Sequence, residues 1–516
     1  MCGIAGIWGA GADPRSLEEM VTRLAHRGPD GRGLWIGGLA ALGHTRLALV
    51  DPEGGGQPLS NEDGRVTAVL NGEIYNHAEL RRELEACGHA FHTRSDTEVL
   101  VHLFEDEGIG FLPRLHGMYA FAVTDGRRLL LARDPLGVKP LYYGWAGERL
   151  LFASELKALA PFTKRLHIFP PGAAVLLDGV PSAEAPLPVA RHYEMPPAGR
   201  WEAIPWPDAV SRVRELVAAA VRERLAADAP VGVLLSGGLD STLVAAFARE
   251  AAGAVDTFAT GLPGSPDLDY AAAAAKWLGT RHHRAVYSRR DVIRALPEVV
   301  QALESFDPAL VRSAAAMWFV ARLAREYVKA VLSGEGADEL FAGYASLEGL
   351  TGRALDEELR SLLSGLHWTN LQRADRICMA HGLEAREPFL DVRLVDFAFR
   401  LPWYYKRRPG EPGKRVLRAA AAGHVPEAVI RRPKAKFSQG TGTAEILRAY
   451  AEEAVTDADF ARARRPDGSP FLSKEEFLYY RIFREVLPEE AAALAGRTRS
   501  VVSGEVGPEK AAGGAR

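Results

Sequence analysis

The chain has 516 residues, too many for one hydrophobic core, so its length predicts two or three domains. Hydrophobic residues make up 47% of it and charged residues 25%, which is ordinary for a folded protein. The formal net charge of -3 argues against a general attraction to nucleic acid or to anionic membranes. The low count of 3 cysteines argues against a disulfide framework, and the lack of a CxxC pair argues against a cysteine-based metal site.

The first residues have neither the charged start nor the apolar run of a secretory signal. No window of about 18 residues is apolar and free of charge, so we predict no membrane span. We therefore expect a cytoplasmic protein.

Short strand-like runs fill the first part of the chain, and Gly and Pro separate them. The runs are RVTAVLNGEIY, GMYAFAVTD, RRLLLARD and RLLFASE. Helices are predicted over 77–87 and 96–107. This mixture predicts an α+β domain over residues 1–190. The Pro-rich stretch over 185–206 is interpreted as a linker between domains.

Strands and helices alternate after the linker. A helix is predicted over 207–225, and the apolar runs VGVLL and VKAVL each lead into a Gly-rich turn and a helix. The alternation predicts an α/β domain over 207–490, with a parallel doubly wound sheet and a helical C-terminal part. Residues 491–516 have little to bury and are expected to form a disordered tail.

A cysteine directly follows the initiator methionine, although cysteine is scarce in this chain. Removal of Met1 would place a free α-amino group beside the Cys2 thiol. Such an amine has a reference pKa of about 8 and can act as a base. The alternative is structural, because Cys2 can simply open the buried strand that the apolar residues after it predict.

An acyl-transfer site also needs oxyanion donors and a substrate clamp. Asn71 and the backbone N–H of Gly72 are candidate donors, and Arg46 and Asp96 are candidate clamps for an α-carboxylate and an α-amino group. Each residue has a purely structural role as its alternative, since Asn-Gly is common in hairpin turns and isolated charges usually form surface ion pairs.

The segment VGVLLSGGLDSTLVAAF joins a strand to a helix through a Gly-rich turn, which favours anion binding. Ser236 and Ser241 add hydroxyl donors, and Asp240 suits a bound Mg²⁺. The sequence lacks the GK[ST] of a Walker loop, and a tight turn in an α/β domain is the alternative.

A second strand end, VLSGEGADE, places Glu335, Asp338 and Glu339 together. Dense carboxylates at the end of a parallel strand favour metal binding or proton transfer, although a helix N-terminus also favours acids. Farther on, RRPKAKFSQG is a basic loop containing Lys434, with a solvated loop as its alternative.

Several motifs together resemble a known family. MCGIAG, HRGPDG, RLALVD, NGEIYN and SDTE resemble the class II glutamine amidotransferase domain. SGGLDS, GLPGSPDLD, SGEGADE, GLEAREPFLD and RRPKAKFS resemble the synthetase domain of the glutamine-hydrolysing asparagine synthetase family. The resemblance implies stacked antiparallel sheets flanked by helices, of the Ntn hydrolase type, followed by an ATP-pyrophosphatase-type domain.

The resemblance implies a glutaminase in the first domain. In it the Cys2 thiol attacks the glutamine amide, Asn71 and Gly72 form the oxyanion hole, and ammonia leaves through an internal tunnel. The implied glutamine-binding residues are Arg46, Leu47, Ala48, Leu49, Val50, Asn71, Gly72, Glu73 and Asp96.

In the second domain the resemblance implies that ATP and Mg²⁺ adenylate the aspartate side chain and that ammonia then displaces AMP. The implied ATP-binding residues are Leu234, Ser236, Gly237, Gly238, Asp240, Ser241, Thr260, Ser333 and Gly334. Asp240 and Asp338 would bind the metal, Glu335 would act as base, Lys434 would contact phosphate, and Arg312 would bind the acceptor.

The implied partners are glutamine, ATP and aspartate or another carboxylate, without nucleic acid or membrane, and a homodimer is expected. Ala309 and Leu310 stand where the family carries two threonines, and Gln439 replaces an aspartate. These departures leave open a natural-product or peptide carboxylate as acceptor. Two further alternatives are a non-catalytic scaffold and a β-lactam synthetase, and Cys2 argues against the latter.

Overall fold

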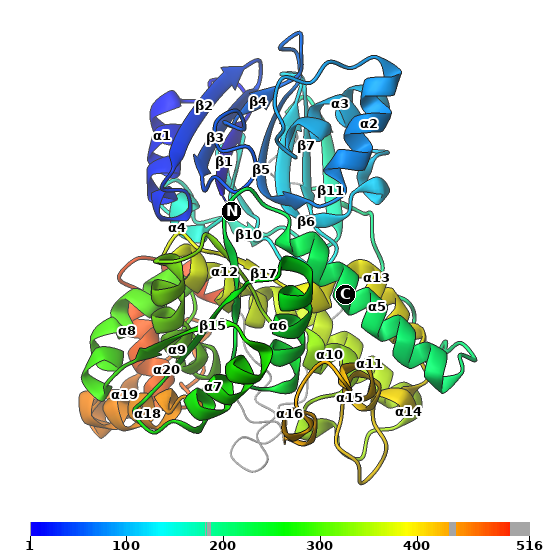
Figure 1. Ribbon diagram of the computed structural model, residues 1–516. Coiled ribbons are helices and arrows are strands. Elements are labelled where there is room, and N and C mark those ends of the chain that lie inside the picture. The colour runs from blue at the N-terminus through cyan, green and yellow to red at the C-terminus, as the bar shows by residue number, and fades with distance from the viewer. Residues whose placement is uncertain (1, 181, 183–186, 433–439, 496–516) are drawn as a thin grey trace.

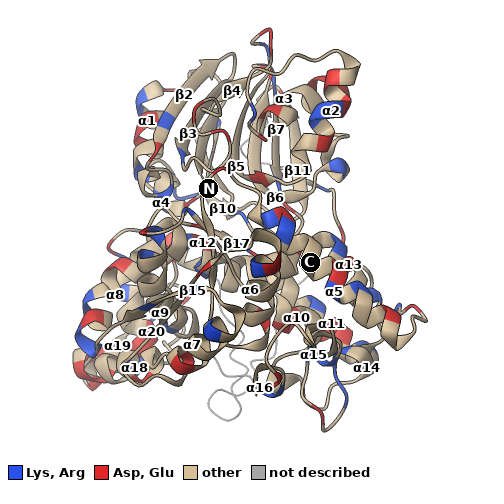
Figure 2. Ribbon diagram, in the orientation of Figure 1, with Lys and Arg blue, Asp and Glu red and all other residues tan. Residues whose placement is uncertain are grey.

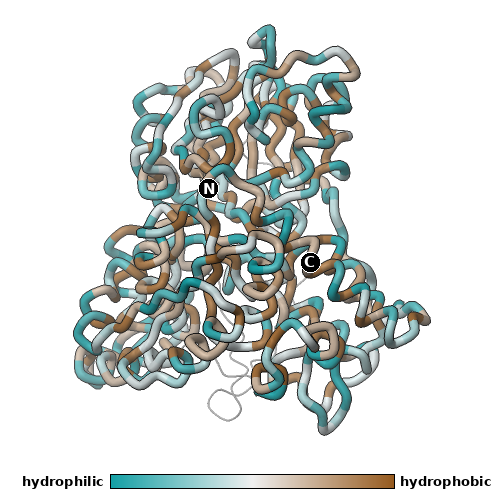
Figure 3. The backbone as a smooth tube through the Cα atoms, viewed as in Figure 1, coloured by the Kyte–Doolittle hydropathy of each residue, from teal (hydrophilic) through white to brown (hydrophobic). Residues whose placement is uncertain are grey.

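The computed structural model describes residues 2–180, 182, 187–432 and 440–495. Figure 1 shows two halves stacked on each other, with the N-terminal strands in one half and most of the helices in the other. The hydropathy colouring of Figure 3 places brown, apolar stretches along the inner strands and teal stretches on outer loops and helices.

Two antiparallel sheets form the N-terminal half. The first has the order β10-β8-β9-β1-β3-β2 and the second β12-β11-β7-β6-β5-β4. The strands of the first sheet are β1 (Gly3–Trp8), β2 (Gly31–Gly37), β3 (Ala40–Arg46), β8 (Tyr142–Ala146), β9 (Arg149–Ala153) and β10 (Leu166–Ile168). Those of the second are β4 (Leu59–Ser60), β5 (Thr67–Ile74), β6 (Gly117–Thr124), β7 (Arg128–Arg133), β11 (Ala173–Asp178) and β12 (Ala190–Arg191).

Alternating residues give each sheet two buried faces, as a strand period of two requires. In β6, Ala120 and Ala122 pack in the core between the sheets, together with Ile4 and Trp8 of β1. The intervening aromatic residues of β6 pack instead in the core under α2 (His77–Cys87) and α3 (Glu98–Glu107). The prediction of stacked antiparallel sheets flanked by helices is confirmed. The helices at the first sheet are α1 (Pro14–Arg23) and α4 (Leu156–Leu159).

A parallel sheet forms the centre of the other half, in the order β15-β14-β13-β16-β17. Its strands are β13 (Val231–Leu234), β14 (Asp256–Gly261), β15 (Arg281–Val286), β16 (Ala330–Leu332) and β17 (Glu384–Arg386). Neighbouring residues point to opposite faces: Phe258 joins one helix-covered core and Ala259 the other. The predicted doubly wound sheet is confirmed. Its order reverses between β13 and β16, and ligands of such sheets bind at this switch point.

Helices cover both faces of the parallel sheet and dominate the C-terminal part (Figure 1). They are α5 (Trp206–Leu225), α6 (Leu239–Ala252), α7 (Pro266–Leu278), α8 (Arg289–Leu303), α9 (Pro308–Arg325), α10 (Ala337–Phe341), α11 (Gly352–Gly365), α12 (Asn370–Met379), α13 (Val392–Arg400), α14 (Trp403–Lys406), α15 (Arg415–Ala421), α16 (Glu427–Arg431), α18 (Thr443–Ala454), α19 (Asp457–Arg462) and α20 (Lys474–Phe483). The 3-10 helices are η1 (Ala25–Arg27), η2 (Leu112–Arg114), η3 (Ala345–Leu347), η4 (Leu366–Trp368), η5 (Pro388–Leu390) and η6 (Glu489–Leu494).

Two expected boundaries differ from the structure. The predicted linker contains β12, which pairs with β11, because backbone hydrogen bonds hold a two-residue edge strand without any apolar pattern. The predicted tail starts too early, since Ala491 and Ala492 of η6 are buried against the helical core. Residues 496–516 lie outside the described part.

In the described part of the chain, no helix is long and apolar enough to cross a membrane. Basic and acidic residues are interspersed along the outer helices of both halves, as Figure 2 shows for α5 and α8. This mixture agrees with the small net charge of the sequence.

A buried ion-pair network joins the two halves. Arg27 of η1 lies 2.7 Å from a carboxylate oxygen of Glu155 and 2.7 Å from one of Asp375, which belongs to α12. Its Nε also donates to the carbonyl of Cys2 at 3.0 Å. Arg27 and Glu155 are fully buried. One guanidinium therefore ties the start of the chain to both halves.

Replacing Arg27 by methionine is expected to destabilise the protein strongly, because two buried carboxylates lose a partner. Loss of one member of a buried pair typically costs about 3–5 kcal/mol, which lowers the thermal unfolding midpoint by about 5 °C or more in a large protein. The control is Arg23→Met, whose pair with Glu19 is exposed and should contribute less than about 1 kcal/mol. Equal midpoints for the two variants would contradict this role.

Candidate active sites

Cys2 lies immediately before β1, at the junction of the two halves, and is 7% exposed. Its backbone nitrogen donates to Oδ1 of Asn71 at 3.3 Å. Burial raises the pKa of the Cys2 thiol above its usual value, and the nearby carboxylates of Glu384 and Glu73 raise it further. A backbone N–H of Leu47 acts in the opposite direction. Because the thiol is held mostly protonated, attack on a carbonyl requires a base.

Asn71 and Gly72 follow each other in β5, facing the start of β1. Gly72 has a φ of 150°, and a Cβ added there would lie 2.0 Å from the carbonyl oxygen of Met118 on β6. Only glycine fits this close strand contact. The amide Nδ2 of Asn71, 3.5 Å from Oγ of Ser154, and the Gly72 N–H are the donors that the sequence predicts for an oxyanion hole.

Buried carboxylates gather beside Cys2. Glu73 is 7% exposed and Asp96 is 6% exposed, and burial raises the pKa of both. The backbone N–H of Ile74 donates to Asp96 at 2.8 Å, which fixes its orientation. Together with Glu384 these groups form an acidic surface that suits an α-ammonium group.

Arg46 holds a loop. Its guanidinium donates to the carbonyls of Val50, Asp51 and Pro52 at 3.3, 2.5 and 2.9 Å. These bonds use part of its five N–H donors. A Cβ added at Gly55 would lie 2.8 Å from Arg46 Nη2 and 3.2 Å from Ser95 Cβ, so Arg46 adjoins the segment that carries Asp96.

The rest of the predicted 46–50 clamp borders the same loop. Ala48 donates its N–H to Asp30 at 2.9 Å, so this N–H is already bonded. Leu49 is buried, and its carbonyl accepts from the backbone of Asp228 in the other half at 2.9 Å.

Arg386 and Glu384, both from β17 in the other half, also lie at this site. Sequence reasoning missed both of them. Arg386 lies 3.4 Å from Glu73 and 2.5 Å from Glu384. Its backbone carbonyl accepts from Ser333 N at 2.9 Å. The motif GLEAREPFLD contains both residues, but only the position of β17 at the sheet edge shows that they reach the Cys2 site.

The Gly-rich turn after β13 has the geometry of an anion-binding loop. The hydroxyls of Ser236 and Ser241 lie 3.0 Å apart, and Ser241 Oγ also accepts from Ser236 N at 3.2 Å. Gly237 has a φ of 68°, and a Cβ there would lie 2.4 Å from the backbone of Tyr270. Gly238 caps α6, so the loop N–H groups and the helix N-terminus lie at the switch point.

The other predicted ATP-binding residues flank this loop. A Cβ added at Gly334 would lie 2.9 Å from Cβ of Asp240 and 3.0 Å from Ser241 N, so the loops after β13 and β16 touch. Leu234 ends β13, and Ser333 follows β16. Thr260 lies in β14, where its hydroxyl donates to the carbonyl of Ala285 at 3.0 Å.

The two predicted metal ligands converge. Asp240 Oδ2 lies 2.6 Å and Asp338 Oδ1 2.5 Å from the same atom, Nζ of Lys414, which is buried. A Cβ on Gly343 would clash with both Asp338 and Lys414, so glycine makes room for this pair. Two convergent carboxylates at a strand end fit Mg²⁺. Sequence reasoning missed Lys414, for which the only signal was a basic residue in the segment EPGKR.

Glu335 and Arg312 both form ion pairs. Glu335 pairs with Arg373 of α12. Arg312 of α9 pairs with Glu475 of α20 through Nε at 3.0 Å and through Nη2. Tyr479 also donates to Glu475 at 3.0 Å. The guanidinium of Arg312, which we predicted to bind the acceptor, is thus partly occupied by the ion pair with Glu475.

The two departures from the family pattern near Arg312 lie in the first turn of α9. Leu310 is 1% exposed and packs in the helical core, while Ala309 is half-buried. The side chain of Leu310 therefore faces the core rather than a substrate pocket.

Lys434 and Gln439 lie outside the described residues. The residues on either side are described: Arg432 donates to the carbonyl of Ser236 at 3.2 Å, and Gly440 accepts from Ser265 at 2.5 Å. Arg432 therefore adjoins the loop of the predicted ATP site, and Gly440 adjoins the start of α7.

Comparisons with known proteins match both halves of the chain to domain families. Residues 1–175 match the glutamine amidotransferase domain family, and residues 212–353 and 348–505 match the asparagine synthase family. A glutamine-hydrolysing asparagine synthetase of Brassica oleracea is 37% identical, over 96% of this chain and 88% of that protein. A second such enzyme, from Arabidopsis thaliana, is 38% identical over 95% and 88%.

Among solved structures, the glutamine phosphoribosylpyrophosphate amidotransferase of B. subtilis aligns with 24% identity and a TM-score of 0.32, over 50% of this chain and 65% of that one. The two domain families and the full-length relatives all lead to one assignment. The chain belongs to the family of glutamine-hydrolysing asparagine synthetases.

Proposed function

We propose that this protein is a ligase that takes ammonia from glutamine and uses ATP to join it to the side chain of aspartate, forming asparagine, AMP and pyrophosphate. One observation carries the proposal. The side chain of Arg386 contacts Glu73 at the Cys2 site, and its backbone carbonyl bonds Ser333 N at the ATP site. A single residue thus adjoins two chemically different sites.

The first reaction is acyl transfer at Cys2. Once Met1 is removed, the new α-amino group takes the thiol proton, and the sulfur attacks the glutamine amide carbon. Asn71 and Gly72 stabilise the negative oxygen of the tetrahedral intermediate. Ammonia leaves with the transferred proton, and water then cleaves the γ-glutamyl thioester to glutamate. Glu73 and Asp96 are proposed to bind the substrate's ammonium group.

Ammonia must reach the second site without protonation by bulk water, because ammonium has no lone pair for attack. A small pocket, partly open to solvent, lies between the halves. Met118, Leu136 and Val138 line it from one half, and Glu387 and Leu390 from the other. This supports an internal route between the sites.

The second reaction activates a carboxylate. The carboxylate oxygen attacks the α-phosphorus of ATP, pyrophosphate leaves, and ammonia then displaces AMP from the acyl carbon. The loop Ser236–Ser241 is proposed to hold the phosphates, with Lys434 beside them. Mg²⁺, when bound, would be held by Asp240 and Asp338 and would neutralise phosphate charge. Glu335 is proposed to accept a proton from the attacking amine.

Aspartate is the proposed acceptor, and a peptide or natural-product carboxylate is the second candidate. The burial of Leu310 weakens the main argument for the second candidate. The test is pyrophosphate release from ATP, Mg²⁺ and ammonium with a panel of carboxylates. Stimulation by aspartate above all others is expected. Stimulation by another carboxylate, with none by aspartate, would reassign the acceptor.

Replacing Arg312 by glutamine is expected to raise the KM for aspartate by about 10-fold or more, because a bidentate guanidinium pair is lost. The pair with Glu475 uses Nε and Nη2, and no described residue accepts from Nη1. The control is Glu475→Gln, which removes the internal partner but keeps the guanidinium. Equal KM values in the two variants would show that Arg312 has only a structural role.

Three earlier expectations stay predictions. A cytoplasmic location is supported by three free cysteines, Cys2, Cys87 and Cys378, since oxidising compartments favour disulfides. The domain limits 1–190 and 207–490, apart from the boundary elements β12 and η6, and a homodimer are the other two.

A further inference from the structure

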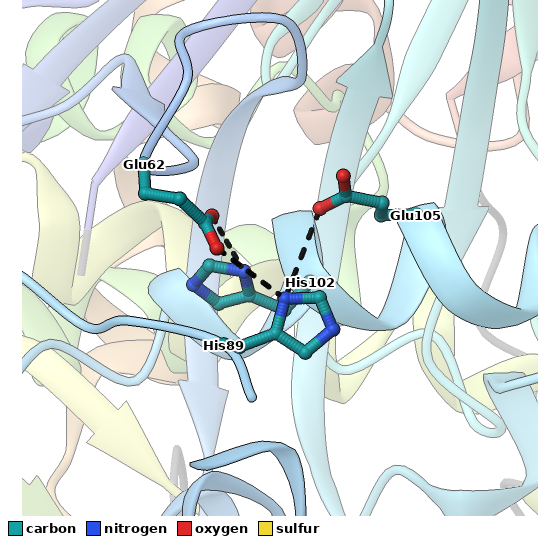
Figure 4. Close-up of side chains that lie close together, drawn as sticks. All are labelled: Glu62, His89, His102 and Glu105. Atoms are coloured by element: carbon teal, nitrogen blue, oxygen red, sulfur yellow. Dashed lines mark ion pairs between the residues drawn. The ribbon is translucent and has the colours of Figure 1, made fainter. Parts of the chain in front are cut away.

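Four potential metal ligands lie together in the N-terminal half, on elements that neither reaction uses. They are Glu62, His89, His102 and Glu105, and their ligand atoms all lie within 4.8 Å of one another. Figure 4 shows the two imidazoles between the two carboxylates. We propose that this cluster binds a divalent cation of the zinc type, which links α3 to the β4–β5 turn and to the loop after α2.

His102 provides the observation that points to a ligand. Its side chain is fully buried, and neither ring nitrogen makes a hydrogen bond. The Nδ1 atom nevertheless lies 3.3 Å from Oε2 of Glu62. A buried polar atom without a partner is costly, so an ion at this position would satisfy it.

His89 has the arrangement that metal-binding histidines usually show. Its Nε2 lies 3.0 Å from Oδ2 of Asp106, and its Nδ1 lies 3.6 Å from Glu62 and 3.9 Å from Glu105. A histidine that binds metal through one nitrogen commonly donates its other N–H to a carboxylate. The Asp106 contact therefore directs Nδ1 of His89 at the cluster.

The backbone also places the ligands well. His102 and Glu105 are three residues apart in α3, so they share one face of the helix. The side chain of Asn61, in the β4–β5 turn, donates to Glu105 at 3.2 Å and accepts from Val66 N at 3.0 Å. The turn that carries Glu62 is thus fixed next to α3.

Charge and chemistry favour a cation of this type. Among the described residues, no Lys or Arg forms an ion pair with any of the four ligands, so the two carboxylates have only the histidines as ion-pair partners. Two imidazoles and two carboxylates form a donor set that suits Zn²⁺, with bond lengths of about 2.0–2.2 Å. The 3.9 Å between Nδ1 of His89 and Glu105 exceeds the spacing around such an ion, so the exposed glutamates would move inward on binding.

In a second cluster, the carboxylates already have arginine partners. His116, Glu223 and Asp391 also approach one another, but Arg224 and Arg393 contact Asp391 at 3.0 and 2.9 Å. Two guanidinium groups already neutralise these carboxylates. Of these two clusters, we therefore place a cation only at the first.

The test uses the full chain, freed of metal with a chelator and titrated with Zn²⁺ against a competing chromophoric chelator. Native protein is expected to bind one zinc more tightly than the variants His89→Gln and Glu105→Gln. Saturating zinc should raise its thermal midpoint by about 5 °C, and that of the variants by much less. Co²⁺ in place of zinc should give the visible bands of a tetrahedral site.

Two controls separate this site from other zinc binding. His424→Gln removes a histidine–glutamate pair elsewhere on the surface, and Cys87→Ser removes an exposed thiol near the cluster. Both should bind zinc as the native chain does. Because His89 and Glu105 are not fully buried, their variants should fold. Equal zinc affinity in native protein and the His89→Gln and Glu105→Gln variants, or loss only in Cys87→Ser, would overturn the proposal.

Discussion

Replacing Cys2 by alanine is expected to lower glutamine hydrolysis by more than about 10³-fold, because the nucleophile that forms the thioester is gone. Synthesis from ammonium salts should continue at a near-native rate. The structural reason is that the Cys2 site and the ATP loop are separate, with contact through Arg386 rather than a shared reacting group. Glutamate release and pyrophosphate release, assayed in parallel, measure the two activities.

The matched control is Cys87→Ala, which removes an exposed thiol from α2 and should leave both activities unchanged. A protein that retains Met1 should behave like Cys2→Ala, since its α-amino group is no longer beside the thiol. Substantial glutaminase activity in Cys2→Ala would contradict the assigned nucleophile.

Replacing Asp240 or Asp338 by asparagine is expected to lower ATP–pyrophosphate exchange by about 10²-fold or more, while glutamine hydrolysis survives. Both carboxylates contact Lys414 Nζ, and both are the proposed Mg²⁺ ligands. An amide keeps the shape of the side chain but removes the charge that attracts the metal. Exchange of labelled pyrophosphate into ATP, measured over a range of Mg²⁺ concentrations, tests this directly.

The control for these variants is Asp269→Asn, which changes an exposed carboxylate on α7 close to the same loop. Its exchange rate should equal that of the native protein. If Asp240→Asn and Asp338→Asn also exchanged at the native rate, the two carboxylates would not be the metal ligands.

Local patterns in the sequence predicted the regular elements well. The helix expected over 77–87 is α2, because its apolar residues recur at helical spacing and Gly88 ends it in a left-handed conformation. The loops after β13 and β16 were recognisable because each places a Gly-rich turn between an apolar run and a helix. The pairing of β12 had no such signal, since its two residues are exposed and only backbone bonds hold them.

The groups that sequence reasoning missed reach their sites from distant segments. Lys414 lies 174 positions from Asp240 along the chain, yet its ammonium contacts that carboxylate. Arg386 reaches Glu73 only because β17 is the edge strand nearest the N-terminal half. Ion pairs of this kind follow no periodic pattern, so they emerge from the assembled fold and not from spacing. The Arg312–Glu475 pair is a third case.

The transfer of nitrogen between the two sites is the most direct test of the proposed function. Purified protein is given ATP, Mg²⁺, aspartate and glutamine labelled with ¹⁵N in its side-chain amide, in the presence of unlabelled ammonium. The proposal predicts asparagine enriched in ¹⁵N beyond the label fraction of the free ammonia pool, with AMP and pyrophosphate in equal amounts. Asparagine that carries only the label fraction of the free pool, or no asparagine while glutamine is hydrolysed, would contradict it.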